Sequence, residues 1–83
     1  MDVVVAVKVV EPYVLDVTFA DGNTRRVDVA PLLHGEMFEP LRDPAVFAAA
    51  SVEPVLGTVV WPNGADLSPE FLRRGERQAI TEQ

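Results

Sequence analysis

The first thirty residues carry the pattern of a β-sheet, and this pattern limits the fold more than any other feature of the chain. Residues 3–10 are mostly valine, so both faces of an extended segment there would be largely apolar. Such a run is typical of a central strand with a neighbour on each side. Residues 13–20 alternate instead, and their apolar face consists of Tyr13, Leu15, Val17 and Phe19. This second strand is expected to bury one face only.

The turn-forming residues at positions 21–23, Asp-Gly-Asn, predict a hairpin that leads to a third strand over residues 25–30. A shift of one residue would turn the valines of the third strand away from the core. The loop should therefore have an odd number of residues. A register that pairs Phe19 with Val27 meets this condition, and we expect that register.

The middle of the chain predicts short helical pieces. Residues 31–34 have the pattern of one helical turn that Gly35 ends. The stretch that follows should turn three apolar side chains inward, namely Met37, Phe38 and Leu41. Asp43 suits a helix N-cap and Pro44 the first helical position, so we expect a helix over residues 44–50.

Residues 55–61 predict a fourth strand, which Gly57 loosens and which a short edge piece at residues 51–53 precedes. We expect this strand to lie beside the first one, because the first strand needs a neighbour on each side. The chain would then form an antiparallel β-meander with the strand order 3-2-1-4, and short helices would pack on one face. This is an α+β fold of two layers. Residues 1–75 are expected to form a single small domain, and residues 76–83 a polar C-terminal tail.

The segment that starts at residue 61, WPNGADLSPEFLRRG, has the residues of a joint between a strand and a helix. Its first four residues suit a β-turn. Ser68 suits a helix N-cap, and Pro69 suits the first helical position. Gly75 should end this helix. The segment is therefore expected to be a turn followed by a short capped helix.

Two residues of this segment, Trp61 and Asp66, are left without a local structural role. Trp61 is expected to be either a core anchor, packed under Phe71 and Leu72, or an exposed aromatic residue that binds a partner. Arg73 would offset the negative end of the helix dipole or contact an acidic partner. The candidate binding surface consists of Trp61, Asn63, Asp66 and Arg73.

The order of these motifs resembles a known family. The stretch YVLDVTFADGNTRRVDVAPLL, the apolar residues Phe38 and Leu41, and the stretch VVWPNGADLSPEFL are similar to the bacterial domains of unknown function 2442. The resemblance covers residues 3–74. It implies a small α+β domain with a β-meander and short helices, and it brings no established activity to the chain. Some members resemble regulators with an added DNA-binding helix-turn-helix, but the residues after Gly75 are not expected to form such a module.

The composition argues against several classes of function. The chain has no cysteine, which excludes disulfides, thiolate zinc sites and cysteine nucleophiles. Its net charge of -6 disfavours binding to the phosphate backbone of nucleic acids. No apolar segment reaches the roughly 18 residues that a membrane span requires, and the N-terminal residues lack the positive charge of a secretory signal. We expect a cytoplasmic protein with no nucleic-acid partner and no membrane partner.

No catalytic or metal-binding constellation stands out in the sequence. His34 is the single histidine, with Glu36 and Glu39 nearby, but no nucleophile accompanies it. Pro40 interrupts the helix that would bring Glu36, Glu39 and Asp43 onto one face as metal ligands. We expect a solvated acidic loop, with no catalytic residue, no metal site and no cofactor. A hydrolase that uses His34 is the weakest hypothesis.

Two hypotheses of function remain open. The first is a non-enzymatic interaction or regulatory module that binds a protein partner, or a second copy of itself. It would do so through the free edge of the strand at residues 25–30, or through the last strand and helix. The second is a small-ligand or anion sensor in which Trp61, Asn63 and the acidic loop line a pocket. Burial of Trp61 would count against the second hypothesis.

Overall fold

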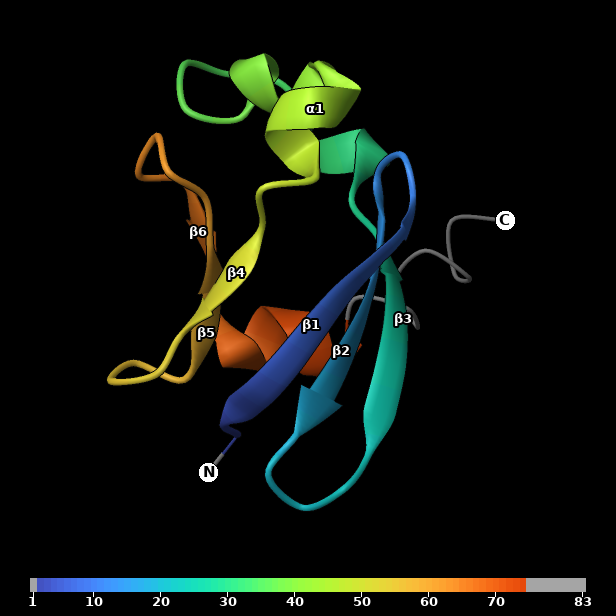
Figure 1. Cartoon of the computed structure of the whole chain (residues 1–83), viewed down its shortest axis with the longest axis vertical. Coiled ribbons are helices and arrows are strands. Elements are labelled where there is room, and N and C mark those ends of the chain that lie inside the picture. Colours follow the sequence, from blue (N-terminus) through green and yellow to red (C-terminus); the bar gives the residue numbers. More distant parts are fainter. Residues whose placement is uncertain (1, 75–83) are drawn as a thin grey trace.

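Two three-stranded antiparallel sheets form the framework of the chain, of which the computed structural model describes residues 2–74 (Figure 1). The first sheet has the order β1-β2-β3 and consists of β1 (Val4–Glu11), β2 (Val14–Phe19) and β3 (Thr24–Asp28). The second sheet has the order β4-β5-β6 and consists of β4 (Ser51–Glu53), β5 (Thr58–Val60) and β6 (Asp66–Leu67). The α+β class predicted from the sequence is confirmed.

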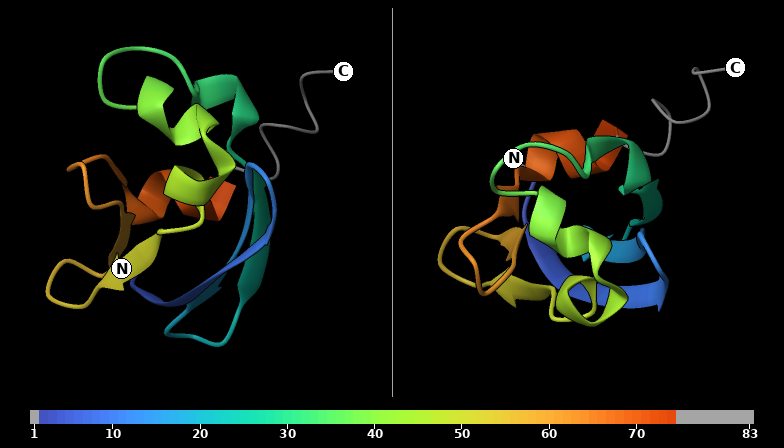
Figure 2. Two further views of the ribbon diagram at one scale, coloured as in Figure 1. Left: turned by 45° about the horizontal axis from the view of Figure 1, so that its top comes forward. Right: turned by 90° about the horizontal axis from the view of Figure 1, so that it is seen from above.

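Three short helical segments connect the two sheets: η1 (Ala30–Leu32), η2 (Glu39–Arg42) and α1 (Pro44–Phe47). A further helical segment over residues 69–74 follows β6. The right view of Figure 2 shows the two sheets and segment 69–74 arranged around a common interior, with α1 at one end. The fully buried side chains come from both sheets and from the helical segments, and include Leu15, Phe19, Leu41, Phe47 and Leu72. No helix among residues 2–74 is long and apolar enough to cross a membrane.

The fourth predicted strand lies in the second sheet, so the expected single sheet with the order 3-2-1-4 is wrong. The first three strands form one sheet in the order 3-2-1, and the fourth predicted strand belongs to a separate sheet. The turn after Pro54 is the reason. The N–H of Gly57 donates to the O of Glu53 at 2.7 Å, which closes a tight hairpin, so β5 pairs with β4 and β6. β1 packs against β4 and β5 and bonds to this hairpin where the N–H of Val4 donates to the O of Gly57 at 2.9 Å. Two sheets around a core thus replace the expected single sheet with helices on one face.

Two β-bulges in β1 determine which of its valines reach the core. The pairing with β2 shifts by one residue between Val4 and Ala6, and again between Val9 and Glu11. The first bulge interrupts the alternation of side chains: Val4 is buried, Val5 and Ala6 are both exposed, and Val7 and Val9 then pack against the core. β1 also lies at the edge of its sheet. The expectation of a central strand with two buried faces is therefore wrong.

The β2–β3 hairpin closes through a three-residue loop, residues 20–22, so the predicted odd loop is confirmed. The N–H of Gly22 donates to the O of Phe19 at 2.9 Å, and the N–H of Phe19 donates to the O of Asn23 at 2.8 Å. Gly22 has a φ of 92°, a conformation that glycine adopts without a steric cost. The turn therefore begins directly after Phe19.

The register of this hairpin differs from the predicted one but keeps the same faces. Val27 lies opposite Leu15 rather than opposite Phe19, because the turn comes earlier than expected. The shift is an even number of residues, so the valines of β3 still face the core. The observed register also places Asp16 opposite Arg26, and the two side chains form an ion pair at 2.8 Å. The attraction of this pair favours the observed register over the predicted one.

The helix in the middle of the chain begins where the sequence predicts and ends sooner. The carboxylate of Asp43 accepts a hydrogen bond from the N–H of Ala45 at 3.0 Å, so the predicted N-cap is confirmed. α1 ends at Phe47 rather than at residue 50, because the chain must turn into β4 at Ser51. The three side chains expected to point inward differ in burial: Leu41 is buried, Phe38 is half-buried and Met37 is exposed.

Candidate interaction surface

The turn between β5 and β6 has the geometry that its sequence predicts. The N–H of Gly64 donates to the O of Trp61 at 3.0 Å, and the N–H of Trp61 donates to the O of Ala65 at 2.9 Å. Asn63 holds this turn on two sides. Its Oδ1 accepts from the N–H of Ala65 at 3.1 Å, and its Nδ2 donates to the O of Met37 at 2.9 Å. The polar atoms of Asn63 are therefore engaged within the protein.

Trp61 lies in the core and is only 2% exposed. Its Nε1 donates to the O of Phe47 at 2.9 Å. The centroid of its ring system lies 5.8 Å from that of Phe47 and 6.4 Å from that of Phe38. Of the two expectations for Trp61, the structure has the core anchor. The aromatic rings beside it come from the η2 and α1 region rather than from the expected Phe71.

The helical segment that follows β6 begins as predicted. The Oγ of Ser68 accepts a hydrogen bond from the N–H of Phe71 at 3.1 Å, and Pro69 is the first helical residue. Asp66 is exposed on β6, next to the buried Leu67, so its side chain points away from the core that holds Trp61. The predicted helix end at Gly75 and the predicted tail at residues 76–83 lie outside the described residues.

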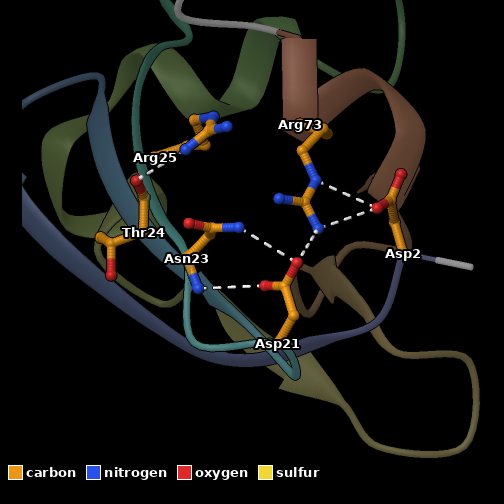
Figure 3. A network of polar contacts seen from close by, with 6 residues as sticks. All are labelled: Asp2, Asp21, Asn23, Thr24, Arg25 and Arg73. Carbon is orange, nitrogen blue, oxygen red and sulfur yellow. Dashed lines mark hydrogen bonds and ion pairs between the residues drawn. The ribbon is translucent and has the colours of Figure 1, made fainter.

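Arg73 joins three distant parts of the chain (Figure 3). Its Nε donates to Oδ1 of Asp2 at 3.0 Å, and its Nη2 donates to Oδ2 of Asp21 at 3.1 Å. The guanidinium carbon lies 4.1 Å from the centroid of the Phe19 ring, where a cation is attracted to the face of the ring. Arg73 therefore ties the helical segment to the start of the chain and to the β2–β3 loop. We call this group the Arg73 clasp.

The N–H of Asn23 and the Arg73 clasp both stabilise the charged form of Asp21. The backbone N–H of Asn23, 3.0 Å from Oδ1, holds the pKa of Asp21 below its ordinary value, and Arg73 acts in the same direction. On the outer face of the first sheet, the hydrogen bond from Arg26 likewise lowers the pKa of Asp16. Both aspartates are thus charged at neutral pH and bound to arginine.

The structure does not bring the four predicted surface residues together as one surface. Trp61 lies in the core, and Asn63 lies in a closed turn. Asp66 lies on the outer face of β6, and Arg73 belongs to the ion-pair cluster of the clasp. A binding site that uses the indole of Trp61 is therefore not available on the protein surface.

Among residues 2–74, the most exposed large apolar side chains lie at the turn between β4 and β5. Val55 is 88% exposed and Leu56 is 64% exposed. We call residues 54–57 the hydrophobic tip. Figure 1 shows this turn projecting at the lower left, on the side of the molecule where β1 begins. Val5, also exposed, directly follows the residue of β1 that bonds to the tip.

The hydrophobic tip is held firmly at its base. The carboxylate of Glu53 accepts from the N–H of Val55 at 2.8 Å, and the O of Glu53 accepts from the N–H of Gly57 at 2.7 Å. Gly57 is buried against β1, and a Cβ built on it would lie only 2.8 Å from Cγ1 of Val3. These contacts fix the backbone on which the two apolar side chains are displayed.

Sequence reasoning missed the hydrophobic tip because it assigned residues 55–61 to one strand. The pair Val55 and Leu56 fits a strand by propensity as well as it fits an exposed turn. The signal that was present is Pro54 and Gly57, a proline and a glycine three positions apart, which is typical of a turn.

The other residues considered for chemistry lie on the surface. His34, Glu36 and Glu39 are exposed, and Asp43 caps α1. Within residues 2–74, no group of three or more His, Cys, Asp or Glu side chains is placed to hold a metal ion. Among residues 2–74, the exposed apolar tip is a surface feature that the local structure does not explain.

Comparison with known proteins identifies the family of the chain. The family model described as Protein of unknown function (DUF2442) matches residues 4–78, and the chain belongs to this family. No curated protein and no solved structure matches the chain. The family description names no activity.

Proposed function

We propose that this DUF2442 domain is a non-enzymatic protein-interaction or regulatory module that acts in the cytoplasm, and that the hydrophobic tip is its main contact. The observation that carries the proposal is the exposure of Val55 and Leu56, 88% and 64%, on a backbone that three hydrogen bonds hold in place. Apolar side chains gathered on a surface favour contact with a partner, because burial there removes them from water.

The fixed backbone of the tip supports the same proposal. A flexible apolar loop would have to be ordered on binding, which costs conformational free energy. In the tip, Glu53 and Gly57 have already ordered the turn in the free protein. Contacts made by Val55 and Leu56 would then contribute to affinity with little loss of entropy.

Other surfaces give weaker support. The outer edge of β3 was the first candidate from the sequence, but the strand carries Arg25, Arg26 and Asp28. Charged residues on an edge strand disfavour the addition of a further strand. The small-ligand or anion sensor has lost its central residue, because Trp61 is buried and Asn63 is bonded to the backbone of Ala65 and Met37. No observation favours it over the interaction module.

The experiment compares two variants of the full chain as bait in co-purification from native cytoplasm. Val55→Ser with Leu56→Ser removes the apolar surface of the tip, and Met37→Ser removes an exposed apolar side chain on another loop. Both variants should fold as the wild type does, since substitutions at exposed sites usually change stability by less than about 0.5 kcal/mol.

We expect the wild type and the Met37 variant to retain the same partner, and the tip variant to lose it. Light scattering on the purified chain separates a heterologous partner from self-association. A strict monomer that recovers no partner in any form would contradict the proposed function.

A further inference from the structure

Acidic residues lie on the three chain segments that meet at the base of the hydrophobic tip. Glu53 lies directly before the tip, and only one of its carboxylate oxygens is bonded to the turn. Glu70 is exposed in the first turn of the helical segment, which begins beside the tip because the Oγ1 of Thr58 donates to the O of Leu67. Asp2 lies on the same side, two residues before the residue of β1 that bonds to Gly57.

The basic residues of the helical segment do not cancel the charge of all these acids. Arg74 lies four residues after Glu70, the spacing at which side chains on one helix can pair, so it can offset Glu70 but not Glu53 and the two aspartates. Arg73 binds Asp2, but it also binds Asp21, so the clasp of one arginine and two aspartates keeps one net negative charge. Lys8 and Arg26 lie with Asp16 on the first sheet, where they lower its pKa. The hydrophobic tip is therefore an apolar projection with a negatively charged base, on a chain whose net charge is -6.

We propose that the hydrophobic tip inserts into an apolar groove of a partner protein, and that lysine or arginine side chains line the rim of this groove. This inference rests on the proposed function and adds the chemistry of the partner to it. Val55 and Leu56 would fill the groove, while Glu53 and Glu70 would face the basic rim. Opposite charges around an apolar contact raise the rate of association and exclude partners of the wrong sign.

The negative charge of the tip base favours a partner protein with a basic rim over two other binding targets, an anionic membrane and a second copy of the chain. An anionic membrane surface repels a negatively charged projection, although it would accept the apolar side chains. A second copy of the chain would bring the same acidic base against itself, and like charges across an interface are unfavourable. A partner with a basic rim is the binding target that interacts favourably with both the apolar side chains and the acidic base of the tip.

The first test maps the contact. The photo-crosslinking residue benzoylphenylalanine replaces Val55 in the full chain, and in a control chain it replaces Met37. After irradiation in native cytoplasm, the crosslinked peptides are sequenced. We expect the probe at position 55 to label a peptide that has aliphatic residues with lysine or arginine beside them, and the probe at position 37 not to label it.

The second test measures the charge contribution with the partner that the first test identifies. Glu70→Lys reverses a charge at the tip base, and Glu36→Lys reverses an exposed charge on the middle loop. We expect Glu70→Lys to slow association by about 3-fold or more at low salt and Glu36→Lys to leave the rate unchanged, with the difference vanishing at high salt.

Several outcomes would overturn this inference and leave the proposed function standing. They are a crosslinked surface without basic residues, equal association rates for the two charge variants, or a homodimer that Val55→Ser with Leu56→Ser dissociates. Binding of the wild type to phosphatidylglycerol vesicles that the tip variant loses would overturn both proposals, as it assigns the tip to a membrane. Loss of every partner together with a strict monomer would remove the proposed function itself.

Discussion

The indole Nε1 of Trp61 donates a hydrogen bond to the backbone O of Phe47 at 2.9 Å, and this bond joins the second sheet to the end of α1. The two rings also contact each other, with their centroids 5.8 Å apart. One side chain therefore supplies both apolar burial and a specific polar link, which orients α1 over the core.

Loss of this link should be measurable in Trp61→Phe. The variant keeps an aromatic ring but removes the indole donor, while the O of Phe47 still accepts from the N–H of Ala50 at 3.2 Å. We expect a loss of about 1 kcal/mol in the free energy of unfolding. Urea denaturation measures it. Asp66→Asn is the control, since this exposed side chain should change stability by less than about 0.5 kcal/mol. An unchanged unfolding midpoint for Trp61→Phe would show that the hydrogen bond contributes nothing.

Asn63 offers a test of the turn that follows Trp61. Asn63→Ala removes both the acceptor for Ala65 and the donor to Met37, and should cost about 1 kcal/mol of stability. Asn63→Asp keeps the acceptor but sets a carboxylate against the O of Met37. We expect thermal unfolding to rank the wild type above both variants, with Asn63→Asp no better than Asn63→Ala. A more stable Asn63→Asp variant would contradict the role of the bond to Met37.

Gly57 should tolerate a side chain far less well than Gly22. A Cβ at Gly57 would lie 2.8 Å from Cγ1 of Val3, whereas a Cβ at Gly22 would have no atom within 4 Å. Both residues have positive φ, 65° and 92°, so both alanine variants carry backbone strain of about 1 kcal/mol. We expect Gly57→Ala to lose clearly more stability in urea denaturation than Gly22→Ala.

A second substitution separates the two costs at Gly57. Val3→Ala removes the atom that the new Cβ would meet. In a double-mutant cycle, the pair Gly57→Ala and Val3→Ala should lose less than the sum of the single variants, because only the steric part is relieved. Strict additivity would show that the close approach to Val3 does not limit residue 57.

The clasp predicts a loss of stability in acid. The pKa of Asp21 is lowered from its ordinary value of 3.8 in the folded protein, so protonation of Asp21 favours the unfolded chain. The stability that Asp21 contributes is complete well above pH 3.8 and is lost as the pH falls through its folded-state pKa. We expect Asp21→Asn to be less stable than the wild type at pH 7.

The difference between Asp21→Asn and the wild type should shrink as the pH falls from 5 to 2, measured by urea denaturation at each pH. A gap between Asp21→Asn and the wild type that stays constant down to pH 2 would rule out the depressed pKa.

The sequence predicted features that depend on a few neighbouring residues. The N-caps at Asp43 and Ser68 and the turn after Trp61 are of this kind, because the side chains that form them lie within three residues of the backbone they bind. The odd hairpin loop also followed from the alternation of apolar residues alone. Such features need no knowledge of the rest of the fold.

Features that depend on distant contacts were not predictable in the same way. The β2–β3 register was settled by a turn that begins at Phe19 and by the pairing of Asp16 with Arg26, which the alternation of valines does not specify. The placement of β5 depended on whether Gly57 closed a turn or continued a strand. The partners of Arg73, at positions 2 and 21, could not be inferred from a helix-end pattern.

The bond between Arg73 and Asp2 links residues that are 71 positions apart in the chain. Closing so long a loop costs more entropy than closing either hairpin, so this contact should form late in folding. An interaction absent from the folding transition state affects the unfolding rate alone. Asp2→Asn should therefore leave the refolding arm of a chevron plot unchanged and raise its unfolding arm, which makes the clasp a determinant of how long the native state persists.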